Sequence, residues 1–154
     1  MLKLRTSKDI ALEKLQHYCA YQDRCHSEVR SKLLKLEIYG DDLEEIMASL
    51  IQDKYLDELR FAKSFARGKF RLKKWGRNKI KIELLKRKVS DYCIRKALEE
   101  IDYSEYIDTL KSLAEQKFSE LGNNLTYDIR YKLTRYLLQK GYEQDLVMQT
   151  IEKL

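Results

Sequence analysis

A run of basic side chains is the strongest candidate for a functional surface in this sequence. Residues 71–88 read RLKKWGRNKIKIELLKRK, and nine of the eighteen are Lys or Arg, against the single acid Glu83. Clustered ammonium and guanidinium groups neutralise phosphates, which makes their binding to nucleic acid dependent on salt. Trp75 could stack on a base or anchor a protein, and it could equally pack between neighbouring parts of the chain. The run therefore predicts contact with a polyanion or with an acidic protein groove.

Only some of these charges need a functional explanation. Basic residues at the end of a helix, such as Lys86 and Lys88, complement the helix dipole. Arg77, Lys79 and Lys81 are expected at the start of a helix, where positive charge is mildly unfavourable, so they favour an external anion. We predict that the following residues contact the partner: Lys69, Arg71, Lys73, Lys74, Trp75, Arg77, Lys79, Lys81, Arg87 and Lys88.

Other reactive side chains fit metal binding or catalysis poorly. One group consists of four residues close in sequence: His17, Cys19, Cys25 and His26. They lack the Cys-x-x-Cys or His-x-x-x-His spacing of a metal site, and no third group is identifiable that would orient a Cys–His nucleophile. Acidic clusters begin predicted helices, where carboxylates favour the dipole. We expect no catalytic residue, no metal and no cofactor, with Cys19 in the core and the other three residues at the surface.

The elements that position the basic run are predicted to be helices. The chain has 154 residues, 44% of them hydrophobic, with five glycines and no proline. Proline is the main breaker of helix interiors, and strands joined by tight turns need more glycine, so a mostly helical chain is favoured. Net charge is +6, but residues 67–88 hold eleven Lys/Arg against one Glu, which leaves the remainder slightly acidic. The positive charge is therefore a local patch.

Targeting signals are lacking in the sequence. No run of about 18 apolar residues occurs, so we expect no membrane span. The first ten residues, MLKLRTSKDI, contain no apolar signal core. Three cysteines without a regular spacing fit a reducing compartment. We therefore expect a cytoplasmic protein.

An internal repeat organises the chain. Six apolar positions recur three times without a gap, at offsets of 51 and 53 residues, and their spacing predicts a helix, a turn and a second helix. A further helix is predicted before each copy, over residues 9–21, 57–70 and 104–120. The recurring positions are Val29, Ile80 and Leu133; Leu33, Leu84 and Leu137; Ile38, Val89 and Tyr142; Leu43, Ile94 and Val147; Met47, Leu98 and Ile151; and Leu50, Ile101 and Leu154.

The turns inside the three copies are predicted to use different residues. In the first copy, Gly40 is expected to end one helix, and an aspartate at 41–42 to cap the next. In the second copy, Ser90 is expected to be the cap, and in the third, Gly141 takes the stop position.

These patterns predict an all-α fold of three tandem three-helix repeats. A three-helix unit of about 45 residues buries little surface alone and gains stability by packing on its neighbours. We therefore expect an elongated, curved helical array rather than a pair of independent bundles. The predicted repeats are residues 1–53, 54–103, which carries the basic run, and 104–154.

Five short segments together form a recognisable pattern: 27–33 (SEVRSKL), 55–62 (YLDELRFA), 76–80 (GRNKI), 83–84 (EL) and 135–142 (RYLLQKGY). In their order and spacing, the chain resembles the RecX family of bacterial RecA regulators along nearly its whole length. Two departures occur: the family usually has Lys-Gly where this chain has Arg87-Lys88, and often a proline where Arg77 follows Gly76.

The resemblance implies a regulator without enzymatic activity. Proteins of this family bind RecA on single-stranded DNA, lie along the groove of the filament, and dampen its growth, ATPase activity and strand exchange. We therefore expect a monomeric modulator of RecA filaments, acting in DNA repair and the SOS response. Arg60 of the family motif is expected to tie helices together through nearby acids. The alternative is a sequence-nonspecific nucleic-acid-binding helical protein without a RecA role.

Overall fold

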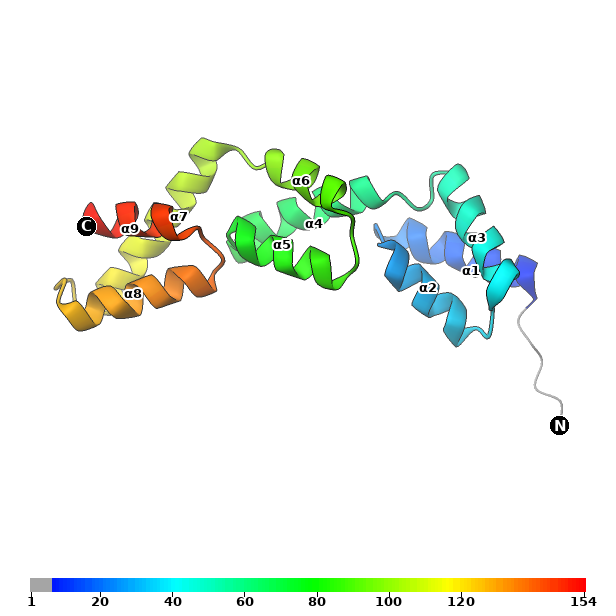
Figure 1. Ribbon diagram of the computed structural model, residues 1–154, viewed down its shortest axis with the longest axis horizontal. Coiled ribbons are helices and arrows are strands. Elements are labelled where there is room, and N and C mark those ends of the chain that lie inside the picture. The colour runs from blue at the N-terminus through cyan, green and yellow to red at the C-terminus, as the bar shows by residue number, and fades with distance from the viewer. Residues whose placement is uncertain (1–6) are drawn as a thin grey trace.

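The computed structural model describes residues 7–154 and shows an all-α helical repeat of elongated shape (Figure 1). Within these residues no strand occurs, and the helices follow one another in three groups of three, as the sequence predicts. The helices are α1 (Lys8–Tyr21), α2 (His26–Lys35), α3 (Gly40–Gln52), α4 (Glu58–Lys73), α5 (Arg77–Lys86), α6 (Asp91–Glu99), α7 (Tyr103–Glu120), α8 (Tyr127–Gln139) and α9 (Gln144–Glu152).

Two further predictions concern the N-terminus and the boundaries between the repeats. The predicted lack of a signal core concerns residues 1–10, and the first six of them lie outside the described residues. None of the helices in residues 7–154 is long and apolar enough to cross a membrane. We retain the predicted repeat boundaries as proposals; α7 begins at Tyr103, so the boundary before residue 104 lies one residue inside that helix.

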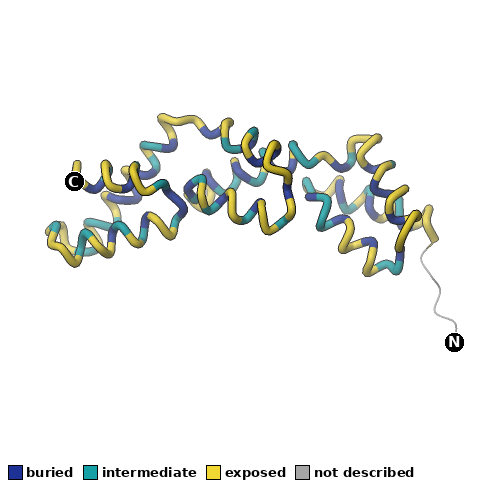
Figure 2. Tube along the Cα trace, viewed as in Figure 1, coloured by how far each residue is buried: buried dark blue, intermediate teal, exposed yellow. Residues whose placement is uncertain are grey.

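The recurring apolar positions form the interior of each group of helices. Of the eighteen predicted positions, all are buried except Leu98 and Leu154, which are half-buried. Figure 2 shows the buried residues on the inward side of the helices in each group. The apolar recurrence therefore predicted the core.

The turn between the second and third helix has the same geometry in all three groups. Glu37, Lys88 and Gly141 adopt left-handed backbone conformations, with φ of 62°, 61° and 103°. The next amide in each turn then bonds back to a carbonyl in the last turn of the helix, for example Ile38 N–H to Leu33 O at 3.0 Å. This is the Schellman motif, which satisfies carbonyls at a helix end.

The first of these turns differs from its prediction. The predicted helix stop at Gly40 is wrong, because the left-handed stop residue is Glu37 and Gly40 is already the first residue of α3. The predicted aspartate cap is wrong as well, since Tyr39 is the N-cap and makes no side-chain capping bond. The aspartates at 41–42 lie instead in the first turn of α3, where their charge still favours the helix dipole.

The other two turns use the predicted residues. Ser90 caps α6, and its hydroxyl accepts a hydrogen bond from Cys93 N–H. Gly141 takes the predicted stop position after α8. The local turn chemistry was therefore predicted correctly in the second and third groups.

Two separate hydrophobic cores run through the molecule. The first belongs to α1–α3 and the segment after them, as far as Leu56. The second is shared by α4–α9, and a chain of aromatic rings crosses it: Phe70 lies 5.8 Å from Tyr106, which lies 5.0 Å from Tyr142, between ring centroids. The second and third groups are therefore joined by apolar packing that the first group does not share to the same extent.

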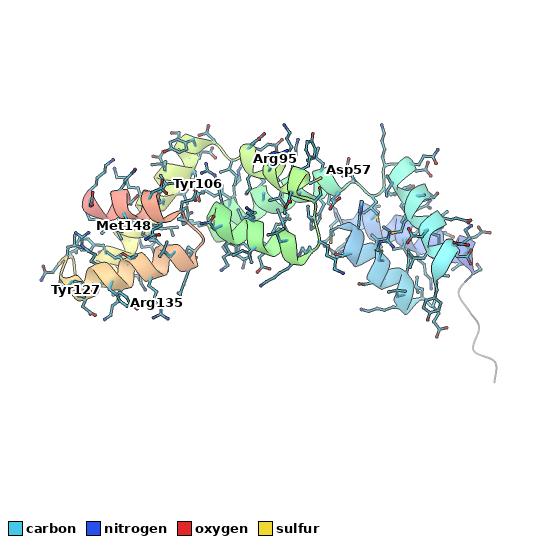
Figure 3. All side chains as sticks on the ribbon, viewed as in Figure 1. Asp57, Arg95, Tyr106, Tyr127, Arg135 and Met148 are labelled. Carbon is cyan, nitrogen blue, oxygen red and sulfur yellow. The ribbon has the colours of Figure 1, made fainter. Side chains whose placement is uncertain are left out.

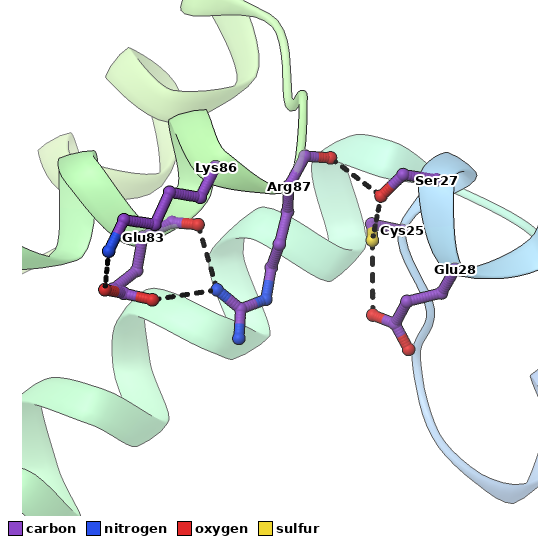
Figure 4. A network of polar contacts seen from close by, with 6 residues as sticks. All are labelled: Cys25, Ser27, Glu28, Glu83, Lys86 and Arg87. Carbon is purple, nitrogen blue, oxygen red and sulfur yellow. Dashed lines mark hydrogen bonds and ion pairs between the residues drawn. The ribbon is translucent and has the colours of Figure 1, made fainter. Parts of the chain in front are cut away.

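Cys25 links the first group to the second core, which corrects the predicted surface position of this residue. Its side chain is fully buried among residues of the second core. Its thiol donates to Glu28 Oε1 at 3.2 Å, and Ser27 Oγ donates to Arg87 O at 2.9 Å across the junction (Figure 4). Burial raises the pKa of the Cys25 thiol, so the neutral thiol is favoured. Cys19 is buried, as predicted.

Arg60 ties the first two groups together, as predicted. Its guanidinium pairs with Asp23 Oδ1 at 2.7 Å. It also donates to the carbonyl oxygens of Lys54 and Tyr55, each at 3.2 Å. Arg60 of α4 therefore holds two segments of the first group, the one that leads into α2 and the one that follows α3.

Candidate nucleic-acid and protein interface

The basic run lies across the central group of helices, from one junction to the other. The α5 helix, about 15 Å long, carries its middle. Next to its start, Gly76 N–H donates to Lys140 O at 2.7 Å, in the third group. At its end, Arg87 O accepts from Ser27 of the first group at 2.9 Å. The predicted contact residues therefore extend between both neighbours of the central group.

Backbone groups make the junction at the start of α5. Besides the Gly76–Lys140 bond, Asn78 N–H donates to Gly141 O at 2.9 Å, and the Tyr142 hydroxyl donates to Lys74 O at 2.8 Å. A Cβ placed on Gly76 would lie 2.3 Å from the carbonyl carbon and oxygen of Gly141. Glycine is therefore required here for two backbones to approach closely.

Arg77 is part of this junction. Its backbone N–H donates to the Tyr106 hydroxyl at 2.9 Å, and its guanidinium pairs with Glu143 Oε2 at 2.8 Å. The Tyr106 hydroxyl donates in turn to Glu143 Oε1. Glu143 compensates the charge at this helix start, so Arg77 needs no external anion to explain its position.

A cation–aromatic cluster brings several of the predicted residues together. The Trp75 ring is half-buried and meets the Phe65 ring edge-on, 6.5 Å between centroids. The ammonium groups of Lys79 and Lys69 lie 4.6 Å and 5.0 Å from the centre of the Trp75 ring. The Arg87 guanidinium lies 4.8 Å from the Phe65 ring. Cation–π attraction holds these like charges close, so an anion placed among them would be bound favourably.

Phe65 is the member of this cluster that the sequence did not indicate as functional. It lies on the helix predicted over residues 57–70 and packs against the second core. The sequence feature that could have indicated this role for Phe65 is Lys69, four residues later. Residues i and i+4 are neighbours on a helix surface, so the Lys69 ammonium can lie near the Phe65 ring. The ring contacts made by Trp75 and Phe65 all come from the central group of helices.

The other predicted cations are exposed and have no ion pair with any described residue. We refer to them as the free basic set: Arg71, Lys73, Lys74, Lys81 and Lys88. By contrast, Lys86 and Arg87 both pair with Glu83, each at 3.2 Å, and hydrogen bonds from these two cations lower the pKa of that carboxyl. The free basic set is therefore the part of the run whose charge is fully available to a polyanion.

A hollow of about 800 Å³ adjoins the free basic set at Lys81. Its lining includes the apolar side chains of Ile94, Leu98 and Ile101, and Arg95 and Glu99 contribute opposite charges. Leu98 lines this hollow, whereas the corresponding Met47 of the first group is buried. The apolar framework of the central group is therefore open at this place.

Metal chemistry has little support in the described residues. Between residues 7 and 154, no three His, Cys, Asp or Glu side chains are grouped so that they could hold a metal ion. The arrangement on α5 can bind and orient a polyanion.

The junction tyrosines give the protein a specific alkaline sensitivity. Burial raises the pKa of Tyr106 and of Tyr142 above the ordinary 10.0, so both stay neutral when folded. Above pH 10 the unfolded chain ionises them and the folded chain does not, so the free energy of unfolding should fall by about 1.4 kcal/mol per pH unit for each tyrosine. Urea unfolding between pH 9 and 11 measures this slope.

The Tyr142→Phe variant is the control for this alkaline effect. It keeps the ring in the core and removes one ionisable hydroxyl. Above pH 10, its free energy of unfolding should therefore fall by about 1.4 kcal/mol per pH unit less than that of the unaltered protein. Equal slopes for the variant and the unaltered protein would contradict the assignment.

Comparisons with known proteins give one consistent family. Residues 57–98 match the model of "RecX, second three-helix domain", and residues 104–151 match "RecX, third three-helix domain". Together the two matches cover more than half of the chain.

Named relatives agree with these matches. Proteins called "Regulatory protein RecX" from Bacillus thuringiensis (strain Al Hakam) and Bacillus anthracis (strain A0248) are each 28% identical over 137 residues. That stretch is 89% of this chain and 51% of either relative, so the chain spans about half the length of the relatives it matches.

Solved structures match over a larger share of their length. The crystal structure of RecX from Lactobacillus salivarius has a TM-score of 0.87 and 25% identity, and the match covers 96% of each chain. A second crystal structure of a regulatory protein RecX has a TM-score of 0.85 at 21% identity, over 94% of this chain and 71% of the other. This second likeness concerns the fold alone.

Proposed function

Because the chain belongs to the RecX family of regulatory proteins, we propose that it binds RecA and RecA–single-stranded DNA filaments and inhibits or modulates the recombinase. The proposed effect is a lower ATPase and strand-exchange activity, without any catalysis by this protein. We further propose that it acts as a monomer in the cytoplasm, in DNA repair and the SOS response.

The observation that carries this proposal is the placement of the basic run. The free basic set and the cation–aromatic cluster lie on the central group of an elongated array, between two junctions. A filament groove offers DNA phosphates beside protein, and such a groove accommodates a long molecule whose central part is positive. Successive groups of helices can then meet successive RecA protomers.

The free basic set also favours a second candidate function. These exposed lysines and arginines could bind nucleic acid without any RecA. A pure nucleic-acid binder should prefer bare single-stranded DNA to RecA-coated DNA at the same salt concentration. A RecA-filament modulator should show the opposite preference.

The proposed function is tested by a RecA ATPase assay on single-stranded DNA. Sub-stoichiometric amounts of the protein should slow ATP hydrolysis, and the filaments seen by electron microscopy should be shorter. Unchanged hydrolysis together with unchanged filament length would exclude the RecA role.

A further inference from the structure

One exposed leucine recurs at the same position in all three groups of helices. Leu34, Leu85 and Leu138 are separated by the repeat offsets of 51 and 53 residues. Their exposed fractions are 49%, 46% and 40%. An apolar side chain left in water costs hydrophobic free energy, and single cases are common on protein surfaces. Three equivalent cases indicate a shared role.

The fold does not explain these side chains. Each leucine supplies its carbonyl oxygen to the Schellman turn, as in the bond from Lys88 N–H to Leu85 O at 3.0 Å. Any residue offers the same carbonyl. The apolar contact that accompanies this motif is made by the preceding buried leucine and the residue after the turn, for example Leu84 and Val89.

Other exposed apolar residues within the recurring stretch do not repeat. Tyr92 corresponds to Asp41 in the first group and to Asp145 in the third. Met148 likewise corresponds to a charged residue in both of the other groups. The leucine position is therefore the one exposed position of this stretch that keeps a large apolar side chain in every group.

The three leucines lie on equivalent helices along one edge of the molecule. In Figure 1, α2, α5 and α8 follow one another along the lower edge. Figure 3 shows Arg135 of α8 projecting outward from the molecule at this lower edge. Leu138 follows Arg135 by three residues, so the two are neighbours on the helix surface. Leu138, Arg135 and Tyr131 line a hollow of about 440 Å³. We refer to Leu34, Leu85 and Leu138 as the leucine row.

Exposed cations accompany the leucine row in two of the groups. Lys81 lies one helical turn before Leu85, and Arg135 lies a similar distance before Leu138. Both are exposed and have no ion pair with a described residue. The surface therefore combines an apolar centre with positive charge, and it complements an apolar socket bordered by acidic side chains.

We propose that the leucine row docks onto a protein polymer that presents one such socket on each subunit; this inference rests on the proposed function, in which the polymer is the RecA filament. Leucine offers no hydrogen bond to phosphate or to a base edge, so nucleic acid is the poorer occupant. Equivalent side chains on successive groups of helices suit equivalent sites on successive subunits, and linked weak contacts add strongly in affinity.

The test is a triple variant, Leu34→Gln, Leu85→Gln and Leu138→Gln. Glutamine keeps the helix propensity and removes the apolar surface. Binding to RecA-coated single-stranded DNA should weaken about tenfold or more, while binding to bare single-stranded DNA should not change. The single variant Leu85→Gln, expected to show a smaller loss of the same kind, is measured in case the triple variant is poorly folded.

A matched control carries Ile51→Gln, Tyr92→Gln and Met148→Gln. These residues lie one on the third helix of each group, with exposed fractions of 45%, 54% and 41%. The control should bind filaments as the unaltered protein does.

Three results would overturn the inference. They are filament binding by the triple variant equal to that of the unaltered protein, an equal loss of binding to bare DNA, and a dimer of the unaltered protein that the triple variant converts to monomers. The last result would assign the leucine row to a second copy of this chain. Failure of the unaltered protein to bind filaments would instead reject the proposed function, so the two failures are distinguishable.

Discussion

The Gly76→Ala substitution is expected to separate the second group of helices from the third and to lower the free energy of unfolding by about 3 kcal/mol. The new Cβ would lie 2.3 Å from the Gly141 carbonyl group and 2.5 Å from Tyr142 N. These are backbone atoms that cannot rotate away. Relief requires the two segments to move apart, which breaks the hydrogen bond from Gly76 N–H to Lys140 O. Urea unfolding measures the loss, and small-angle X-ray scattering measures the change in shape.

Gly68→Ala is the matched control for this effect. Gly68 lies inside α4, and a Cβ there would meet no atom within 4 Å. Alanine in the interior of a helix should increase stability by about 0.5–1 kcal/mol relative to glycine. A Gly76→Ala protein as stable as the unaltered one would show that the junction is not close-packed in solution.

The apolar recurrence was sufficient to predict the helices and the core. Positions such as Val29, Ile80 and Leu133 are fully buried because each faces the inside of the same three-helix arrangement. Recurrence cannot predict how the groups join, since the junction residues do not recur. Gly76 meets Gly141, which lies 65 residues further along the chain and has a different role in its own turn.

The position of the basic run on its helices could be predicted from the sequence, whereas its ion pairs could not. The charge run lies where helical periodicity placed it, at the end of α4 and along α5. The partner of Arg77 is Glu143, and the fold alone brings these distant residues together. A helix dipole argument considers only the local chain, so it could not distinguish Arg77 from Lys81, which has no such partner among the described residues.

Trp75 shows the same limit of local reasoning. From sequence, stacking on a base and packing inside the protein were equally open. Its ring lies half-buried against Phe65, with Lys69 and Lys79 beside it. One side chain can therefore serve both purposes: it closes the core of the central group and holds two cations where an anion could bind.

Replacing Lys73, Lys74 and Lys81 together with glutamine is expected to weaken the salt-dependent binding to single-stranded DNA strongly. Each phosphate contact contributes about 0.7 to the slope of log affinity against log salt for single strands, so the slope should fall by up to about 2. The three lysines are exposed and make no ion pair with a described residue, so stability should change by less than about 0.5 kcal/mol per site. Fluorescence anisotropy across a salt series measures the slope.

A second triple variant tests whether DNA binding depends on where the positive charges lie or only on how many there are. Lys14, Lys111 and Lys153 are also exposed and lie outside the basic run, so their replacement with glutamine removes the same net charge. This control should keep nearly the full salt slope. Equal slopes for the two variants would mean that the protein attracts DNA through its overall charge and not through the free basic set.

The Lys73, Lys74 and Lys81 variant also shows whether DNA or RecA supplies most of the energy of filament binding. If phosphates in the filament groove supply most of it, the Lys73, Lys74 and Lys81 variant should lose inhibition of the RecA ATPase in parallel with its affinity for bare DNA. If RecA supplies most of it, inhibition should persist although bare-DNA binding is lost. The leucine row is proposed to contact RecA and not phosphate, so its triple variant should keep binding to bare DNA and lose inhibition of the RecA ATPase. The free basic set and the leucine row can then be assigned to different parts of one filament.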